Sequence, residues 1–285
     1  MIAQNTIMAV LIGIVITGVI PLLGGLILLA MGKIKGSSFW AGVLAYIIAM
    51  IVYSIASGIY AATTMDLSNL ASMTTEISAI AIIVMSLLLS VFMALSMGIC
   101  IAGCMKLRTF QAAVSCGLGF GVSYMLTNAI GLVSIYFQFV QINSGAFDAT
   151  YRAAIENGFM TKEDFNLLKS QMINTPVSDI VLSTVNSVIS ALLYVAIAIF
   201  IMRGVCSKNT FTGIAASTLV MAASSLPSAL DNIYLAMTIG SVISAAAFVF
   251  ALTMKNKIVP PPKPAAMVND PFLQAVESSR QDDGK

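Results

Sequence analysis

Three sulfur-bearing side chains, those of Met97, Cys100 and Cys104, follow one another at intervals of three and four residues. On a helix this spacing places all three on one face. Thioether and thiolate groups are the ligands that Cu(I) prefers, so the three residues are candidate metal ligands. Methionine and free cysteine are also ordinary core residues, and the chain has 18 methionines. We therefore favour packing over metal binding here, and we expect no cofactor.

Serine hydroxyls are abundant in two apolar stretches, "VLSTVNSVISA" and "MAASSLPSAL". A serine nucleophile needs a base beside it, and the sequence contains no histidine. The same absence removes the commonest metal ligand. In apolar helices such hydroxyls more often bridge neighbouring helices by hydrogen bonds. The sequence therefore disfavours a serine protease.

A third pattern is the stretch "GLGFGVSYML", in which Gly117, Gly119 and Gly121 recur at every second position. Glycine has no Cβ, and small residues allow the backbones of two membrane helices to approach closely. We therefore expect close helix packing at these three glycines.

The elements that carry these residues are predicted to cross a membrane. The 285-residue chain is 59% hydrophobic and 9% charged, whereas a soluble domain is about 25% charged. A spanning helix needs about 20 apolar residues. The sequence predicts an all-α transmembrane bundle of about seven spans: 7–31, 39–61, 77–104, 110–140, 177–202, 210–230 and 233–254. Pro21 is expected to kink the first span, and the fourth is long enough to tilt or to extend beyond the bilayer.

The basic residues divide unequally between the two ends of these spans. Eleven share one side: Lys33, Lys35, Lys106, Arg108, Arg203, Lys208, Lys255, Lys257, Lys263, Arg280 and Lys285. Only Arg152, Lys162 and Lys169 lie on the other. The positive-inside rule therefore predicts an N-terminus outside and a C-terminus in the cytoplasm. The net charge of +2 indicates no nucleic-acid partner.

Acidic residues avoid the predicted spans. No Asp or Glu occurs from Ile77 to Phe147, and Asp179 and Asp231 come nearest to the membrane. Charges within the bilayer are costly and usually mark ion pathways or catalysis. Proton-coupled transport and carboxylate catalysis inside the bilayer are both disfavoured.

The chain divides into a transmembrane domain, 1–258, and a proline-rich cytoplasmic tail, 259–285, with a short helix expected over 271–280. The one sizeable external loop, 145–176, is expected to be a helical hairpin. Its first helix ends at Gly158, and the second begins with a capping-box-like pair, Thr161 and Asp164. An amphipathic hairpin resting on other loops or lipid is the favoured interpretation, and a lid or docking surface is the alternative.

Several segments resemble motifs of one family of membrane enzymes. Residues 117–124 resemble a Gly-x-Gly-His-Gly-Gly-x-Glu stretch, and "MAASSLP" at 221–227 resembles a late His-Ala-x-x-Asp-x-Pro element. "INSG" at 142–145 and "NTP" at 174–176 resemble the family's loop and the entry to its next helix. The family is that of the YhfC-type membrane peptidases, relatives of the CAAX proteases and the PrsW-like glutamic intramembrane proteases. The resemblance runs from the first span to the last.

This chain departs from the family pattern where the family does its chemistry. Neutral side chains stand at positions where the family has histidine, glutamate, arginine or aspartate: Phe120, Tyr124, Asn186, Ser187, Tyr194, Met221 and Ser225. A further Glu-Glu motif would fall near Ser96 and Met97. Family members are expected to bind a metal and activate water with such a set. The resemblance therefore implies the fold without the catalysis, in a degenerate member with no metal ligands.

The leading hypothesis is a catalytically inactive protein of a bacterial cytoplasmic membrane that binds a hydrophobic or transmembrane partner. The seven replaced positions would line its groove, or would simply pack helices together. Two alternatives remain open: a structural subunit of a larger transport or secretion complex, and an active intramembrane peptidase with an atypical site.

Overall fold

The computed structural model describes residues 1–64, 79–158, 160–230 and 232–258, and the elements in these ranges are helices. Within these ranges seven segments are long and apolar enough to span a membrane, which confirms the predicted number. They are built from α1 (Gln4–Ile14) with α2 (Ile20–Ala30), α3 (Gly36–Thr64), α4 (Ala79–Ile99), α5 (Phe110–Ser144), α8 (Val177–Cys206), α9 (Thr210–Ser225) and α10 (Ile233–Leu252). The expected tail helix over 271–280 lies outside the described residues.

Side-chain caps fix where several of these helices begin. Thr109 accepts a hydrogen bond from the backbone N–H of Ala112 at the start of α5, and Asn209 and Asn232 cap α9 and α10 in the same way. Gly145, with a φ of 78°, ends α5, because this left-handed conformation suits glycine. Local sequence therefore sets the helix boundaries that position the interior.

The first span contains a π-helical segment, η1 (Val15–Val19), which ends two residues before Pro21. Proline has no N–H to donate to the carbonyl four residues earlier, and a π turn accommodates this irregularity without ending the helix. The predicted disturbance at Pro21 therefore takes the form of a π turn within one span from Gln4 to Ala30.

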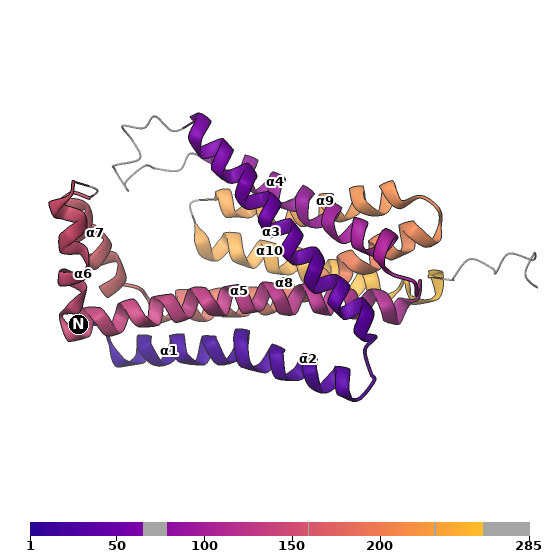
Figure 1. The fold of residues 1–285 in the computed structure, drawn as a ribbon, viewed down its shortest axis with the longest axis horizontal. Helices are drawn as coiled ribbons and strands as arrows, with labels where there is room; N and C mark the ends of the chain where they lie inside the picture. Colours follow the sequence, from indigo (N-terminus) through magenta and orange to yellow (C-terminus); the bar gives the residue numbers. More distant parts are fainter. Residues whose placement is uncertain (65–78, 159, 231, 259–285) are drawn as a thin grey trace, which may run out of the picture.

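Helices α5 and α8 form the central layer of the bundle. Figure 1 shows α1 and α2 along one side of this pair and α4, α9 and α10 on the opposite side, with α3 crossing α5. The main core lies along α8, where Leu193 to Met202 are all buried. The α5–α8 pair thus has two faces, one toward α1 and α2 and the other toward α4, α9 and α10.

The predicted external segment contains α6 (Ala146–Glu156), followed by Gly158, and α7 (Lys162–Ile173). The capping box between Thr161 and Asp164 is formed. Phe147 and Phe165 are buried and stack at 5.7 Å between ring centroids, in a second core cluster with residues of α1, α5 and α8. The hairpin thus packs on the protein through this aromatic cluster.

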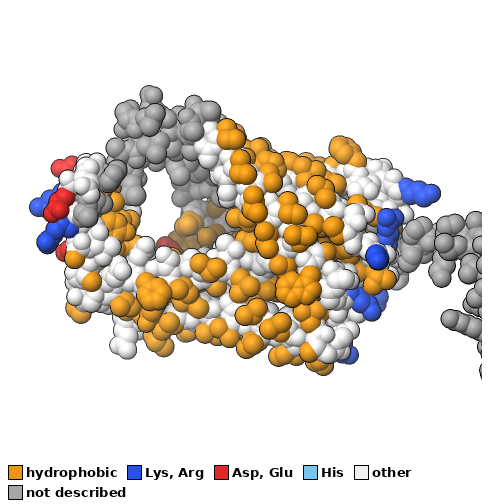
Figure 2. All heavy atoms as spheres, in the orientation of Figure 1, with side chains coloured by type: hydrophobic (Ala, Val, Ile, Leu, Met, Phe, Trp, Pro, Cys, Tyr) orange, Lys and Arg blue, Asp and Glu red, His pale blue; other side chains and the backbone are white. Residues whose placement is uncertain are grey.

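Charged side chains gather at the two ends of the bundle. In Figure 2 one end carries Lys and Arg, and the other carries the mixed charges of α6 and α7, with hydrophobic side chains between them. We call these the basic end and the hairpin end. The connections around Lys33, Lys106 and Lys208 all lie at the basic end. The cytoplasmic position of this end remains a prediction.

Candidate functional site: a hydroxyl-lined cavity

The glycine stretch of α5 brings three helices together. A Cβ on Gly119 would collide with the carbonyl of Phe39 in α3, and a Cβ on Gly117 would collide with the backbone of Val195 in α8. One on Gly121 would lie 3.2 Å from Cα of Ala191. The absence of side chains at these positions therefore lets α5 contact α3 and α8 backbone to backbone.

A reciprocal glycine, which the sequence interpretation missed, lies on α3. A Cβ on Gly42 would collide with the carbonyl of Cys116, which is buried in α5. Gly42 lies in the long apolar α3 with no neighbouring glycine pattern to single it out. Only the packing of α3 on α5 reveals its role.

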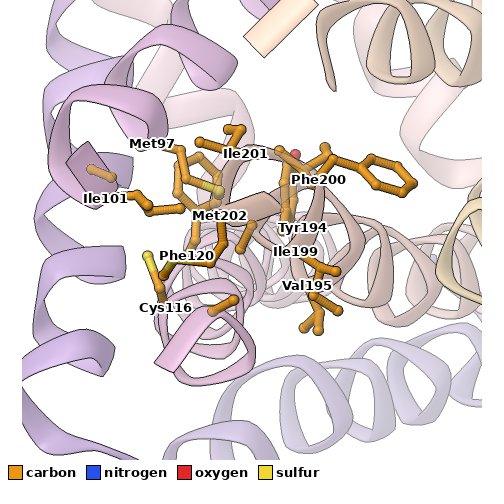
Figure 3. Close-up of a cluster of buried hydrophobic side chains, with 14 of the residues drawn as sticks. Met97, Ile101, Cys116, Phe120, Tyr194, Val195, Ile199, Phe200, Ile201 and Met202 are labelled. Atoms are coloured by element: carbon orange, nitrogen blue, oxygen red, sulfur yellow. The ribbon is translucent and has the colours of Figure 1, made fainter. Parts of the chain in front are cut away.

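Phe120, at the family's histidine position, is fully buried in the core. Its ring lies 5.2 Å from that of Tyr46 and 4.7 Å from that of Tyr194, measured between centroids. Figure 3 shows Phe120 in the buried cluster with Cys116 and Tyr194. Phe120 therefore packs against other aromatic rings and is not among the residues that line the cavity described next.

Beside this aromatic group lies a cavity of about 560 Å³ between α4, α5, α8, α9 and α10. Five of the seven predicted groove positions line it: Tyr124, Asn186, Tyr194, Met221 and Ser225. The cavity extends from Ser228 and Ile233, at the connection of α9 and α10 on the hairpin end, to Tyr194 in the interior of α8. The structure therefore brings together residues that are 101 positions apart in sequence, from Tyr124 to Ser225.

Serine hydroxyls supply most of the polar lining. Beyond the predicted residues, the lining includes Ser86, Ser90, Ser190, Ser224, Ser228 and Ser244. Several of these hydroxyls donate to carbonyls of their own helix, for example Ser90 to Ser86 at 2.8 Å and Ser244 to Gly240 at 2.8 Å. Because the hydroxyl hydrogen is used in this way, the oxygen retains lone pairs that accept hydrogen bonds. Among the described residues the lining carries no Lys, Arg, Asp or Glu, and its serine oxygens therefore suit a neutral group that donates hydrogen bonds.

Ser187, the remaining predicted position, lies on a different face of α8. It donates to the carbonyl of Ser183 at 2.9 Å and lines a smaller cavity of about 200 Å³ between α5 and α8. Asn128 lines this cavity too, and its buried Nδ2 has no hydrogen-bond partner. Ser187 is therefore separate from the hydroxyl-lined cavity.

The sulfur-bearing set of Met97, Cys100 and Cys104 lies at the basic end of α4. Met97 and Cys100 are buried in the main core, whereas Cys104 is exposed at the end of the π-helical segment η2 (Cys100–Cys104). The described residues include no cluster of three or more His, Cys, Asp or Glu that could hold a metal ion. The geometry favours packing for Met97 and Cys100.

A family model described as YhfC intramembrane metalloprotease matches residues 104–248, just over half of the chain. The chain belongs to this family. No curated protein and no solved structure matches it. The matched segment runs from the end of η2 into α10, so it includes the whole of α5, α8 and α9.

The family description implies a metal ion, and the residues of this cavity do not fit one. The lining residues that the structure describes offer hydroxyl, amide, phenol and thioether groups, without the imidazole, thiolate or carboxylate that bind catalytic zinc. Met221 and Ser225 both reach the cavity but supply only a thioether and a hydroxyl. No hydrolytic step can therefore be assigned to a metal held by these residues.

Proposed function

We propose that this multi-pass membrane protein is a catalytically inactive member of its family that binds a hydrophobic molecule or a transmembrane segment in the hydroxyl-lined cavity. The single observation that carries the proposal is the composition of the cavity. The positions that resemble the family's reactive ones hold Tyr124, Met221 and Ser225, and these residues surround a space of about 560 Å³. We further place the protein in a bacterial cytoplasmic membrane.

The physical basis is the cost of charge in a membrane interior. Neutral hydroxyl and amide groups can be held there by hydrogen bonds to their own helices, whereas an isolated charge is expensive. A ligand with an apolar body and a small hydrogen-bond donor would match the methionine side chains and the serine oxygens together. Met93, Met221 and Met237 supply adaptable apolar surface in the same lining.

The first test measures zinc content and peptide cleavage in protein purified in mild detergent. We expect less than stoichiometric zinc and no cleavage of a transmembrane peptide. One zinc per chain together with peptide cleavage would overturn the proposed inactivity and support an active peptidase with an atypical site.

The binding test uses a photoreactive monoacylglycerol, which has one acyl chain and two hydroxyl donors. We expect labelling of cavity residues, and weaker labelling by a photoreactive fatty acid methyl ester, which has no donor. Ser190→Phe should fill the cavity and reduce labelling several-fold, with Met237→Trp as a second filling variant. Val185→Phe is the control, because Val185 is 47% exposed on the same helix.

Equal labelling of all three variants would contradict binding in this cavity. A stoichiometric membrane-protein partner that co-purifies, with no labelling of the cavity, would instead support the structural-subunit alternative.

A further inference from the structure

An apolar groove lies on the opposite side of α5 and α8 from the hydroxyl-lined cavity. It has a volume of about 270 Å³ and is bounded by α2, α3, α5 and α8. Its lining is entirely apolar: Pro21, Gly24, Gly25, Leu28, Ile34, Phe39, Leu118, Gly121, Val122, Met125, Val188, Ala191 and Leu192. The groove is therefore a separate site on the first-span side of the molecule.

Two glycines of α2 leave room along this groove. A Cβ on Gly24 would meet no atom within 4 Å, and one on Gly25 would lie 3.5 Å from the ring of Phe39. From Pro21 to Leu28 the groove follows α2 for about 10 Å at 1.5 Å per residue. This length is most of one leaflet's hydrocarbon depth, about 15 Å. The dimensions suit part of an acyl chain that lies along the helix.

The groove ends at the basic end of the bundle, in the connection between α2 and α3. Ile34 of this connection is buried and lines the groove, while its neighbours Lys33 and Lys35 are exposed. The only ion pair among the described residues, between Lys169 and Asp148, lies in the hairpin. Within the described ranges, two lysines that pair with no acidic side chain therefore flank the point where the apolar lining ends.

Hydrogen bonds to α5 hold this connection in place. The backbone N–H of Lys35 donates to Oγ of Ser115 at 2.9 Å, and Nε2 of Gln111 donates to the carbonyl of Lys33 at 2.8 Å. The backbone of both lysines is thus fixed beside the groove, and no acidic side chain of the described part of the chain pairs with their ammonium groups. Each such lysine near a membrane surface adds appreciable attraction for an anionic lipid.

We propose that this groove is a binding site for one anionic glycerophospholipid. One of its acyl chains lies along Gly24 and Gly25, and its phosphate contacts Lys33 and Lys35. The site is independent of the hydroxyl-lined cavity and of the function proposed for that cavity. It gives the first span, which has few buried residues of its own, a lipid contact that fixes it to α3 and α5.

Native mass spectrometry of the full chain tests the proposal. After delipidation, phosphatidylglycerol or phosphatidylcholine with identical acyl chains is added back. We expect one phosphatidylglycerol to bind more tightly than phosphatidylcholine, and Lys33→Gln combined with Lys35→Gln to weaken it on the order of tenfold. Lys255→Gln combined with Lys257→Gln is the control, because these lysines lie at the basic end but, unlike Lys33 and Lys35, are not adjacent to a residue that lines the groove.

A second pair of variants tests the acyl-chain contact. Gly24→Leu should fill the groove and displace the lipid without disturbing the fold, since no atom lies near this position. Gly58→Leu is the matched control, because a Cβ there also meets nothing within 4 Å and it does not line the groove. Equal binding of the two lipids, binding that survives both groove variants, or a dimer that excludes lipid would each overturn the proposal.

Discussion

At the residue scale, neutral groups take up the positions that the family resemblance marks as reactive. Phe120 joins an aromatic core group with Tyr46 and Tyr194, while Tyr124 and Tyr194 lie 5.1 Å apart between ring centroids beside the cavity. Tyr46 is held by a 2.8 Å hydrogen bond from its hydroxyl to Thr127. Phe120 therefore stabilises helix packing, whereas Tyr124 and Tyr194 also border the cavity.

The close contact at Gly119 gives a prediction about stability. Gly119→Ala should lower the free energy of unfolding by about 1–3 kcal/mol, because the added methyl group collides with the Phe39 carbonyl and α3 must move. The midpoint of thermal unfolding in detergent measures the effect.

Gly131→Ala is the control on the same helix, since a Cβ at Gly131 meets no atom within 4 Å. Alanine favours helix over glycine, so this variant should be as stable as the original or slightly more stable. Equal stability of the two variants would contradict backbone contact between α5 and α3.

At the element scale, α5 connects the transmembrane core with the hairpin. Its 35 residues extend for about 52 Å at 1.5 Å per residue, longer than a hydrocarbon core of about 30 Å. Near its end, Asn143 accepts a hydrogen bond from the backbone N–H of Ile2 at 2.6 Å, and Phe139 packs in the hairpin cluster. The extra length of α5 therefore supplies the surface on which the N-terminal segment and the hairpin are fixed.

The aromatic contact of the hairpin gives the second prediction. Phe165→Ala should lower the free energy of local unfolding of the hairpin by about 3–5 kcal/mol, because it removes a buried ring that stacks on Phe147. Limited proteolysis should then cleave within 145–176 faster, while the transmembrane helices remain protected. Leu167→Ala is the control because Leu167 is 47% exposed, and it should leave the cleavage rate unchanged. Unaltered cleavage in both variants would show that the aromatic cluster does not hold the hairpin.

At the scale of the whole molecule, two spaces of different chemistry lie on opposite faces of the α5–α8 pair. The cavity toward α9 and α10 is lined by hydroxyls, whereas the groove toward α2 and α3 is apolar. Close packing at Gly117 and Gly121 lets α5 and α8 separate them. The two sites can therefore be tested independently.

The charge distribution gives the third prediction, on orientation. The positive-inside rule places the basic end in the cytoplasm, so with seven spans the N-terminus lies outside. A fluorescent protein that folds only in the cytoplasm should fluoresce when fused after Lys285. A protease added from outside should cleave only at the hairpin end of the bundle. The control fuses the same reporter at the N-terminus, where no fluorescence is expected. Fluorescence from the N-terminal fusion alone would show that the protein has the opposite orientation.

Much of the fold follows from the sequence by itself, because bilayer thickness and hydrophobic length impose a local rule. The predicted fourth span, 110–140, and fifth, 177–202, correspond to α5 and α8, which extend a few residues further. Their added turns are less apolar, so hydropathy alone ended the spans too early. Caps such as Thr161 with Asp164 were also readable, since they depend on neighbours in the chain.

The site was only partly predictable. Resemblance to the family identified Tyr124, Asn186, Tyr194, Met221 and Ser225, which share a cavity, but it also selected Phe120 and Ser187, which lie elsewhere. The serines contributed by α4 and α10 carried no distinguishing pattern. The face that a residue presents depends on how its helix is rotated against its neighbours, and no local signal encodes that rotation.

The sequence by itself determined a membrane-spanning helical bundle without histidine, since length, hydropathy and composition are properties of the chain alone. The tertiary structure decided which faces of α5 and α8 are in contact, through the fit of Gly42, Gly117 and Gly119 against opposing backbone. That contact, in turn, places the hydroxyl-lined cavity and the apolar groove on opposite sides. The physical reason is that cavities arise from packing between distant segments, so they exist only once the helices are assembled.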